Sequence, residues 1–259
     1  MSPPAKKLKT STSQPETIVS TSIMDEATVA AGPEVPVTKE QMNQMLRTLR
    51  NSETVDQAVD AMKALYEDIN TNEKDKNRCE AAAKLIVELE GVGTIHAAMK
   101  DWNAQSEEFS RFALGSFIQL TLVEKTTKTL TRLGAIKTIL VTAKKHKDDF
   151  LMRANTVALL CIISGTDNNE TTEDVAIDAC TDLVLESMKK WPKKVSMQRS
   201  GCGYFYRIST VDNMKAKLRA KGICSVLSNV IDIFLDSDDD EEKEACKWAK
   251  EAHYKYAVK

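Results

Sequence analysis

Residues 134–146, with the sequence GAIKTILVTAKKH, contain the pattern that decides the fold. Ile139, Ala143 and His146 follow one another at intervals of four and three residues, so they lie on one face of a helix. The same three-row pattern recurs along the chain. The first row is Met42, Ile95, Ile139, Val184 and Leu227; the second is Leu46, Met99, Ala143, Met188 and Ile231; the third is Leu49, Trp102, His146, Trp191 and Phe234. The last four members of the first row are 44, 45 and 43 residues apart, and the first interval is 53. A fixed period of this size is typical of a stacked-repeat array.

Each unit is predicted to hold a short helix, a medium helix that ends at the third-row residue, and a longer third helix. The opening unit has only its second and third helices, which suits a terminal cap. The expected helices span residues 38–50, 54–69, 76–90, 124–132, 134–146, 149–164, 171–179, 181–191, 194–209, 211–220, 222–235 and 240–256. Gly134, Gly222 and the pair Gly91 and Gly93 mark the break between first and second helices. Thr38, with Gln41 three residues later, predicts a capping box at the first helix.

The third helices repeat as well. Their aligned residues are Leu65, Phe117, Leu159, Phe205 and Trp248, each 13 to 16 residues after the third-row residue of its unit. Two patterns in register indicate a real repeat. No single unit could bury its apolar face alone, so the core is expected to form by stacking.

Composition sets further limits. The 259 residues are 42% hydrophobic, with a net charge of −2. Acidic and basic residues balance within 37–259, so we expect neither nucleic acid nor a membrane as partner. The chain has no apolar run long enough to span a bilayer. Residues 1–36 are rich in Ser, Thr, Pro and Ala without a periodic apolar face, and we expect a disordered N-terminal tail there.

Four of the six cysteines are spaced by half a repeat. They are Cys180, Cys202, Cys224 and Cys246, at intervals of 22 residues. This rhythm could indicate a metal site or a disulfide pattern, but there is no CxxC motif and no Cys/His cluster. We expect reduced, small buried residues at shared repeat positions, and no metal. Gly201 and Gly203 beside Cys202 favour close helix packing over a reactive thiol.

Three helices per unit, with Gly before the second, resemble the armadillo repeat. Stretches 134–140 (GAIKTIL) and 197–205 (MQRSGCGYF) are similar to that family. The resemblance implies an all-α, right-handed alpha solenoid over residues 37–259, with four three-helix units plus a partial N-terminal unit. HEAT repeats, with two helices per unit, are the near alternative, but the short helices at 124–132 and 211–220 argue against them.

In armadillo proteins the third helices line a concave groove, and an Asn near the end of each third helix commonly holds the backbone of a bound peptide. The matching positions here are Gln119, Cys161, Arg207 and Lys250, and none is Asn. The Trp-x-x-x-Asn pairs of nuclear-import adaptors are also missing, so a groove for basic import signals is not expected. Gln119, Arg207 and Lys250 are the candidate partner-binding residues, and ordinary solvated helix surface is the alternative interpretation.

The aromatic and histidine residues of the third row do not indicate catalysis. Trp102, His146 and Trp191 share one repeat position, which predicts packing where the second helix turns into the third. The histidines have no ligand-spaced partner, and the chain contains no nucleophile elbow, P-loop or dinucleotide-binding motif. We therefore expect a protein that is not an enzyme and needs no cofactor.

Two charged segments remain. Lys6, Lys7 and Lys9 follow two prolines in the expected tail and resemble a nuclear localisation signal, which predicts a nuclear or nucleocytoplasmic location. Residues 236–242 (DSDDDEE) are densely acidic. We expect their carboxylates to favour the positive end of the last helix, with recognition of a basic partner as the alternative.

The sequence thus predicts a non-catalytic scaffold or adaptor that binds other proteins through the concave third-helix face of an armadillo-like array. The alternative is a nuclear transport adaptor that carries a cargo protein by means of its own N-terminal signal. RNA binding by helical repeats would require a regular base-reading pair on every unit, and Gln119, Cys161, Arg207 and Lys250 are too irregular for that.

Overall fold

The computed structural model describes residues 37–70, 76–165, 177–211 and 214–257. Within these ranges the chain forms thirteen α-helices and no β-strand, which confirms the all-α prediction. The helices are α1 (Lys39–Arg50), α2 (Val55–Ile69), α3 (Lys76–Glu88), α4 (Gly91–Trp102), α5 (Glu107–Leu120), α6 (Lys125–Arg132), α7 (Ala135–Lys145), α8 (Phe150–Ser164), α10 (Asp178–Lys190), α11 (Val195–Ile208), α12 (Met214–Ala220), α13 (Ile223–Phe234) and α14 (Asp240–Ala257).

The predicted helices match these bounds to within three residues, apart from one range. The helix expected at 171–179 lies almost entirely outside the described residues, and α10 begins at Asp178 rather than at the expected residue 181. The opening unit consists of α1 and α2, as predicted. Complete sets of three helices follow in α3–α5, α6–α8 and α12–α14.

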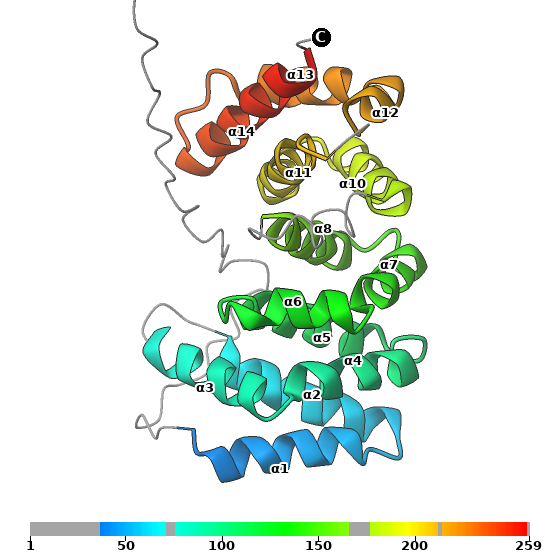
Figure 1. Ribbon diagram of the computed structural model, residues 1–259, viewed down its shortest axis with the longest axis vertical. Helices are drawn as coiled ribbons and strands as arrows, with labels where there is room; N and C mark the ends of the chain where they lie inside the picture. The colour runs from blue at the N-terminus through cyan, green and yellow to red at the C-terminus, as the bar shows by residue number, and fades with distance from the viewer. Residues whose placement is uncertain (1–36, 71–75, 166–176, 212–213, 258–259) are drawn as a thin grey trace, which may run out of the picture.

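The units lie one above another along the long axis of the molecule (Figure 1). The third helices contact each other in chain order, α2 against α5, α5 against α8, α8 against α11, and α11 against α14. The second helices follow the same rule through α1, α4, α7, α10 and α13. Elements about one repeat apart in sequence are therefore neighbours in space.

The repeated apolar residues form the core. All five members of the first row are fully buried, and so are Leu65, Phe117, Leu159 and Phe205 of the third helices. Ile231 and Trp248, in the last described unit, are half-buried. The prediction that burial comes from stacking is confirmed at the fully buried positions.

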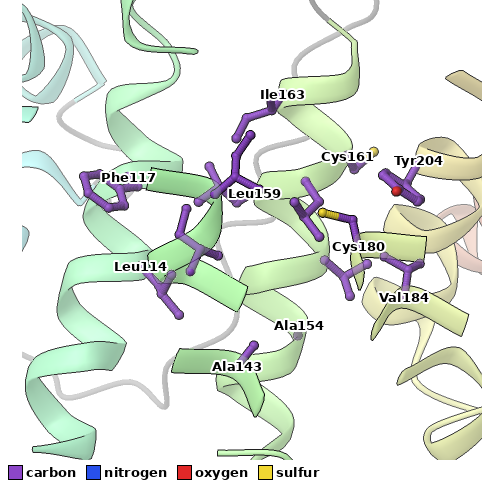
Figure 2. Close-up of a cluster of buried hydrophobic side chains, with 14 of the residues drawn as sticks. Leu114, Phe117, Ala143, Ala154, Leu159, Cys161, Ile163, Cys180, Val184 and Tyr204 are labelled. Carbon is purple, nitrogen blue, oxygen red and sulfur yellow. The ribbon is translucent and has the colours of Figure 1, made fainter. Parts of the chain in front are cut away.

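The centre of the stack joins three layers in one apolar cluster (Figure 2). Leu114 and Phe117 come from α5, Leu159 and Cys161 from α8, and Tyr204 from α11. Each is at most 2% exposed. Complete burial of a Leu or Phe side chain stabilises a fold by about 1.5–3 kcal/mol, so this cluster fixes the order of the layers.

Polar side chains close the first turns of several helices. The predicted capping box is present, with Gln41 N donating to Thr38 Oγ1 at 3.2 Å and Thr38 N donating to Gln41 Oε1 at 2.9 Å. The side chains of Thr54, Ser106 and Asp149 cap α2, α5 and α8, each by accepting one hydrogen bond from a backbone N–H three residues later. These caps satisfy backbone N–H groups that have no partner within the helix.

Second helices are also joined by polar pairs about one repeat apart. Arg50 Nη2 donates to Thr94 Oγ1 at 3.0 Å, which joins α1 to α4. His96 Nε2 lies 3.0 Å from Thr138 Oγ1, which joins α4 to α7. Burial, followed by the charge of Lys100, lowers the pKa of His96, so the neutral ring is favoured in this contact.

In three of the described units, the junction between first and second helices contains one residue with left-handed backbone geometry. Gly134 and Gly222 take this role, with φ of +67° and +81°. In the second unit the expected break at Gly91 and Gly93 is wrong, because the left-handed residue is Glu90, with φ of 58°. Gly91 is the first residue of α4, and an added Cβ there would collide with Ile86 of α3. Its lack of a side chain serves close packing.

We predict opposite effects on stability at these junctions. A Cβ at Gly134 meets no atom within 4 Å, so Gly134→Ala changes only the backbone strain and should lower the free energy of unfolding by about 1 kcal/mol. Glu90→Gly should raise it by up to about 1 kcal/mol, since relief of strain exceeds the added entropy of the unfolded chain. Urea unfolding of both variants checks this, and effects of the same sign would contradict it.

Candidate protein-binding face

One side of α8 faces away from the rest of the stack. Leu151, Asn155, Ala158 and Ile162 recur at helical spacing, and all four are half-buried, whereas most of α8 between them is buried. The buried side of α8 packs on α5, α11, α7 and α10. The outward stripe is therefore mostly apolar, with one amide.

A patch of aromatic and cationic groups lies on α11 and α14, and Arg207 of this patch contacts Cys161 of α8. The rings of Tyr206 and Trp248 pack edge to face, with 5.3 Å between their centroids. The Arg207 guanidinium lies 5.7 Å from the Trp248 ring, and Lys255 Nζ lies 5.5 Å from the Tyr206 ring. All four side chains are half-buried. We call the α8 stripe together with these four residues the third-helix face.

Arg207, a predicted partner-binding residue, is fixed by neighbouring units on both sides. Its Nη1 donates to the carbonyl oxygen of Cys161 at 2.8 Å and contacts Cys161 Sγ at 2.6 Å. That carbonyl belongs to the last turn of α8, where backbone acceptors lack helical donors. Arg207 therefore caps α8 while its guanidinium also covers Trp248 on α14.

Gln119 and Lys250 have different surroundings. Gln119 is only 6% exposed, and its Nε2 donates to Oδ1 of Asn70, the residue that ends α2, at 3.4 Å. Its Oε1 is buried without a hydrogen-bond partner among the described residues. Lys250 is exposed on α14. The three predicted residues therefore do not form one cluster. Gln119 and Arg207 instead connect successive third helices at their C-terminal ends, as the Tyr256 hydroxyl does by donating to the Phe205 carbonyl at 2.7 Å.

The third helices carry a row of three arginines that was not predicted from the sequence. Arg111, Arg153 and Arg199 stand at one repeat position, 42 and 46 residues apart, and this spacing was the available signal. Arg153 and Arg199 are buried, with 3% and 6% of their surfaces exposed.

Each arginine of this row reaches an acidic residue of the next unit. Arg111 pairs with Asp149 at 2.7 Å, Arg153 with Glu186 at 3.3 Å, and Arg199 with Glu244 at 3.1 Å. Removal of Glu186 or Glu244 would leave a buried guanidinium without its charge partner. These pairs therefore hold the units in register.

The third-row residues pack as predicted. Trp102 and Trp191 are half-buried against the core, and Trp191 meets the Phe150 ring at 5.8 Å between centroids. His146 Nδ1 lies 3.8 Å from Glu107 Oε2, and its Nε2 is buried without a hydrogen-bond partner among the described residues.

The cysteine thiols are largely removed from solvent. Five of the six are buried, and Cys224 is half-buried. Burial raises the pKa of Cys180 to about 12 and raises that of Cys202 as well, so both thiols are protonated and weakly nucleophilic at neutral pH. An added Cβ at Gly201 would collide with Met188, and one at Gly203 would lie 3.0 Å from Cys161 Sγ, which confirms the predicted close packing.

The acidic segment 236–242 joins α13 to α14, and Asp240, Glu241 and Glu242 stand in the first turn of α14, as predicted. Among the described residues, no group of three or more His, Cys, Asp or Glu side chains is placed to hold a metal ion. In the same part of the chain, no helix has the length and hydropathy needed to cross a bilayer. Lys6, Lys7 and Lys9 lie outside the described residues.

No protein-family model matches this chain, and no curated protein matches its sequence.

We predict that Asp149 stabilises the stack in two separable ways. Its Oδ1 accepts from Met152 N at 3.0 Å as the cap of α8, and its Oδ2 pairs with Arg111. Asn is an equally good cap, so Asp149→Asn should lose only the ion pair, costing about 1 kcal/mol, while Asp149→Ala should cost about 2 kcal/mol.

The ion pair also predicts a pH dependence. Burial opposes ionisation of Asp149, but the Met152 N–H and the Arg111 guanidinium together hold its pKa below 3.8. Its stabilising contribution is thus complete above about pH 4 and is lost as the pH falls through the lower folded-state pKa. Urea unfolding at several pH values should show the gap between wild type and Asp149→Asn closing in acid. A gap of constant size would contradict this account.

Proposed function

We propose that the chain is an armadillo-type alpha solenoid that acts as a non-catalytic scaffold or adaptor for another protein. The fold assignment is supported by the 44-residue period, the left-handed residue between first and second helices, and the continuous row of third helices. A solenoid suits binding because neighbouring units present one extended surface.

The third-helix face is the proposed binding surface, and its aromatic patch is the observation that carries the proposal. Tyr206 and Trp248 keep part of their rings exposed beside Arg207, and these three residue types dominate binding energy at protein interfaces. Arg207 is already held by Cys161 and Trp248, so a partner would lose little side-chain entropy by contacting it. Ile162 follows Cys161, the residue that Arg207 contacts, and adds half-buried apolar surface on α8.

The proposed mode of binding differs from that of peptide-binding armadillo proteins. In place of the groove asparagines, Gln119 and Arg207 direct hydrogen bonds to neighbouring helices. They have fewer free donors for an extended peptide backbone. We therefore propose that the partner is recognised by its side chains, against Ile162, Tyr206 and Trp248.

Substitutions on this face should separate binding from folding. We expect Ile162→Ser combined with Trp248→Leu to weaken partner binding at least tenfold, since loss of a hot-spot contact costs about 2 kcal/mol. The partner would be isolated by affinity capture with the wild-type chain and then titrated against each variant.

The matched control replaces Leu133 and Val141 by Ser. These residues are 36% and 55% exposed, in the α6–α7 turn and on α7. The control should bind like wild type, and thermal unfolding should show that both proteins fold. Equal binding by wild type and the third-helix-face variant would reject this surface.

The lysine cluster in the tail leads to a separate proposal about location. We propose that Lys6, Lys7 and Lys9 direct the chain to the nucleus. Replacing the three with Ala in a fluorescent fusion should shift the signal toward the cytoplasm, while replacing Lys63, Lys125 and Lys128 should not. An unchanged distribution would reject the signal, together with the transport-adaptor alternative that depends on it.

A further inference from the structure

Two bends between second and third helices form one strongly basic edge. The α7–α8 and α10–α11 bends are adjacent, because Lys190 Nζ donates to the Lys147 carbonyl at 3.1 Å and pairs with Asp148. Seven lysines of these bends are exposed, and we call them the lysine edge. They are Lys144, Lys145, Lys147, Lys189, Lys190, Lys193 and Lys194.

Most of this charge is uncompensated. Three carboxylates lie in the same segments, and each is already paired, Asp148 with Lys190, Asp149 with Arg111, and Glu186 with Arg153. Among the described residues, the other six lysines have no carboxylate at ion-pair distance. The near-zero net charge of the chain therefore conceals a local excess of positive charge.

Helix stability does not explain all of these lysines. Lys144, Lys145, Lys189 and Lys190 stand in the last turns of α7 and α10, where cations are favoured by the helix dipole. Lys193 and Lys194 instead precede α11, whose N-terminal end disfavours cations, and α11 has neither a side-chain cap nor an acidic first turn. Their position is unfavourable for folding, which points to a role in binding.

An aromatic pair lies between the lysines. Phe150 and Trp191 pack edge to face and are both half-buried. Lys190 Nζ lies 4.8 Å from the Trp191 ring, and Lys194 Nζ lies 5.3 Å from the Phe150 ring. The edge thus offers an apolar contact surrounded by ammonium groups.

Acidic residues border the lysine edge on both sides. The preceding bend leads into Glu107 and Glu108 at the start of α5, and the following bend carries the acidic segment 236–242. The two acidic bends are neighbours of the lysine edge because α4 packs on α7 and α10 packs on α13. A long polyanion such as a nucleic acid would meet like charge at either end, whereas a short acidic segment would not.

We propose that the lysine edge is a second binding surface, which recognises a short acidic protein segment containing an aromatic or aliphatic residue. The carboxylates contact the lysines, and the apolar side chain contacts Phe150 and Trp191. This surface is separate from the third-helix face, and the proposal does not depend on that face binding anything.

The test uses the full chain and a fluorescein-labelled peptide of Glu and Asp residues with Phe-Leu at its centre. Fluorescence anisotropy should show binding that weakens as salt increases. Replacing Lys144, Lys147, Lys189 and Lys193 by Glu should weaken binding about tenfold or more, because several exposed charge contacts are lost together. A peptide with Ser-Gly in place of Phe-Leu should also bind more weakly.

The matched control replaces Lys63, Lys125, Lys128 and Lys215 by Glu, which changes the net charge equally at exposed positions on α2, α6 and α12. It should bind within about twofold of wild type, since charges beyond a Debye length are screened. Equal loss in the control would overturn the proposal. Tighter binding of oligothymidylate of matched charge, or of phosphatidylserine vesicles, than of the acidic peptide would also overturn it, by assigning the edge to nucleic acid or to lipid.

Discussion

The contact of each third helix with the next is the interaction on which the rest of the structure depends. Phe117, Leu159 and Phe205 are fully buried in this row, and each belongs to a different unit. The helices approach closely where glycine replaces a side chain. An added Cβ at Gly115 of α5 would lie 2.7 Å from the Tyr66 ring of α2, and one at Gly203 of α11 would lie 3.0 Å from Cys161 Sγ of α8. The apolar surface of one unit is thus covered by its neighbours, as expected of a repeat protein.

This packing also decides which polar residues are available for function. Side chains at the unit boundaries are used to hold layers together, as Gln119, Arg153 and Arg199 show. Accessible side chains include those of the outward stripe of α8 and those at the bends. The two proposed binding surfaces are the places where such side chains gather with aromatic groups.

The sequence predicted the helices well because their bounds depend on local signals. Apolar spacing, the capping box of Thr38 and Gln41, and the glycines at 134 and 222 act over a few residues. Glu90 was missed because it occupies a position where the third and fifth units have Gly, and nothing local marks a Glu as left-handed. The repeat register itself, 44 residues before Gly134, would have located it.

Local sequence signals could not predict which side chains contact each other between units. Repeat position correctly placed Arg207 near the end of α11, but its contact with Cys161 depends on how α8 and α11 cross. The three arginines recur at repeat spacing, but their acidic partners do not. Asp149 precedes α8, Glu186 lies on α10 and Glu244 lies on α14. The lysine edge could not be recognised from the overall charge balance. Its basic bends lie between acidic bends along the chain, so their charges cancel when they are summed over residues 37–259.

Each unit is stabilised mainly by the contacts of its third helix with the third helices of the neighbouring units. Hydrogen exchange measured by mass spectrometry tests this most directly. Leu159→Ala would create a cavity in α8 at a cost of about 2–5 kcal/mol. The account predicts faster exchange in α8, and to a smaller degree in α5 and α11, with the least change in α1. Faster exchange confined to α8, or equal in α1 and α11, would contradict it.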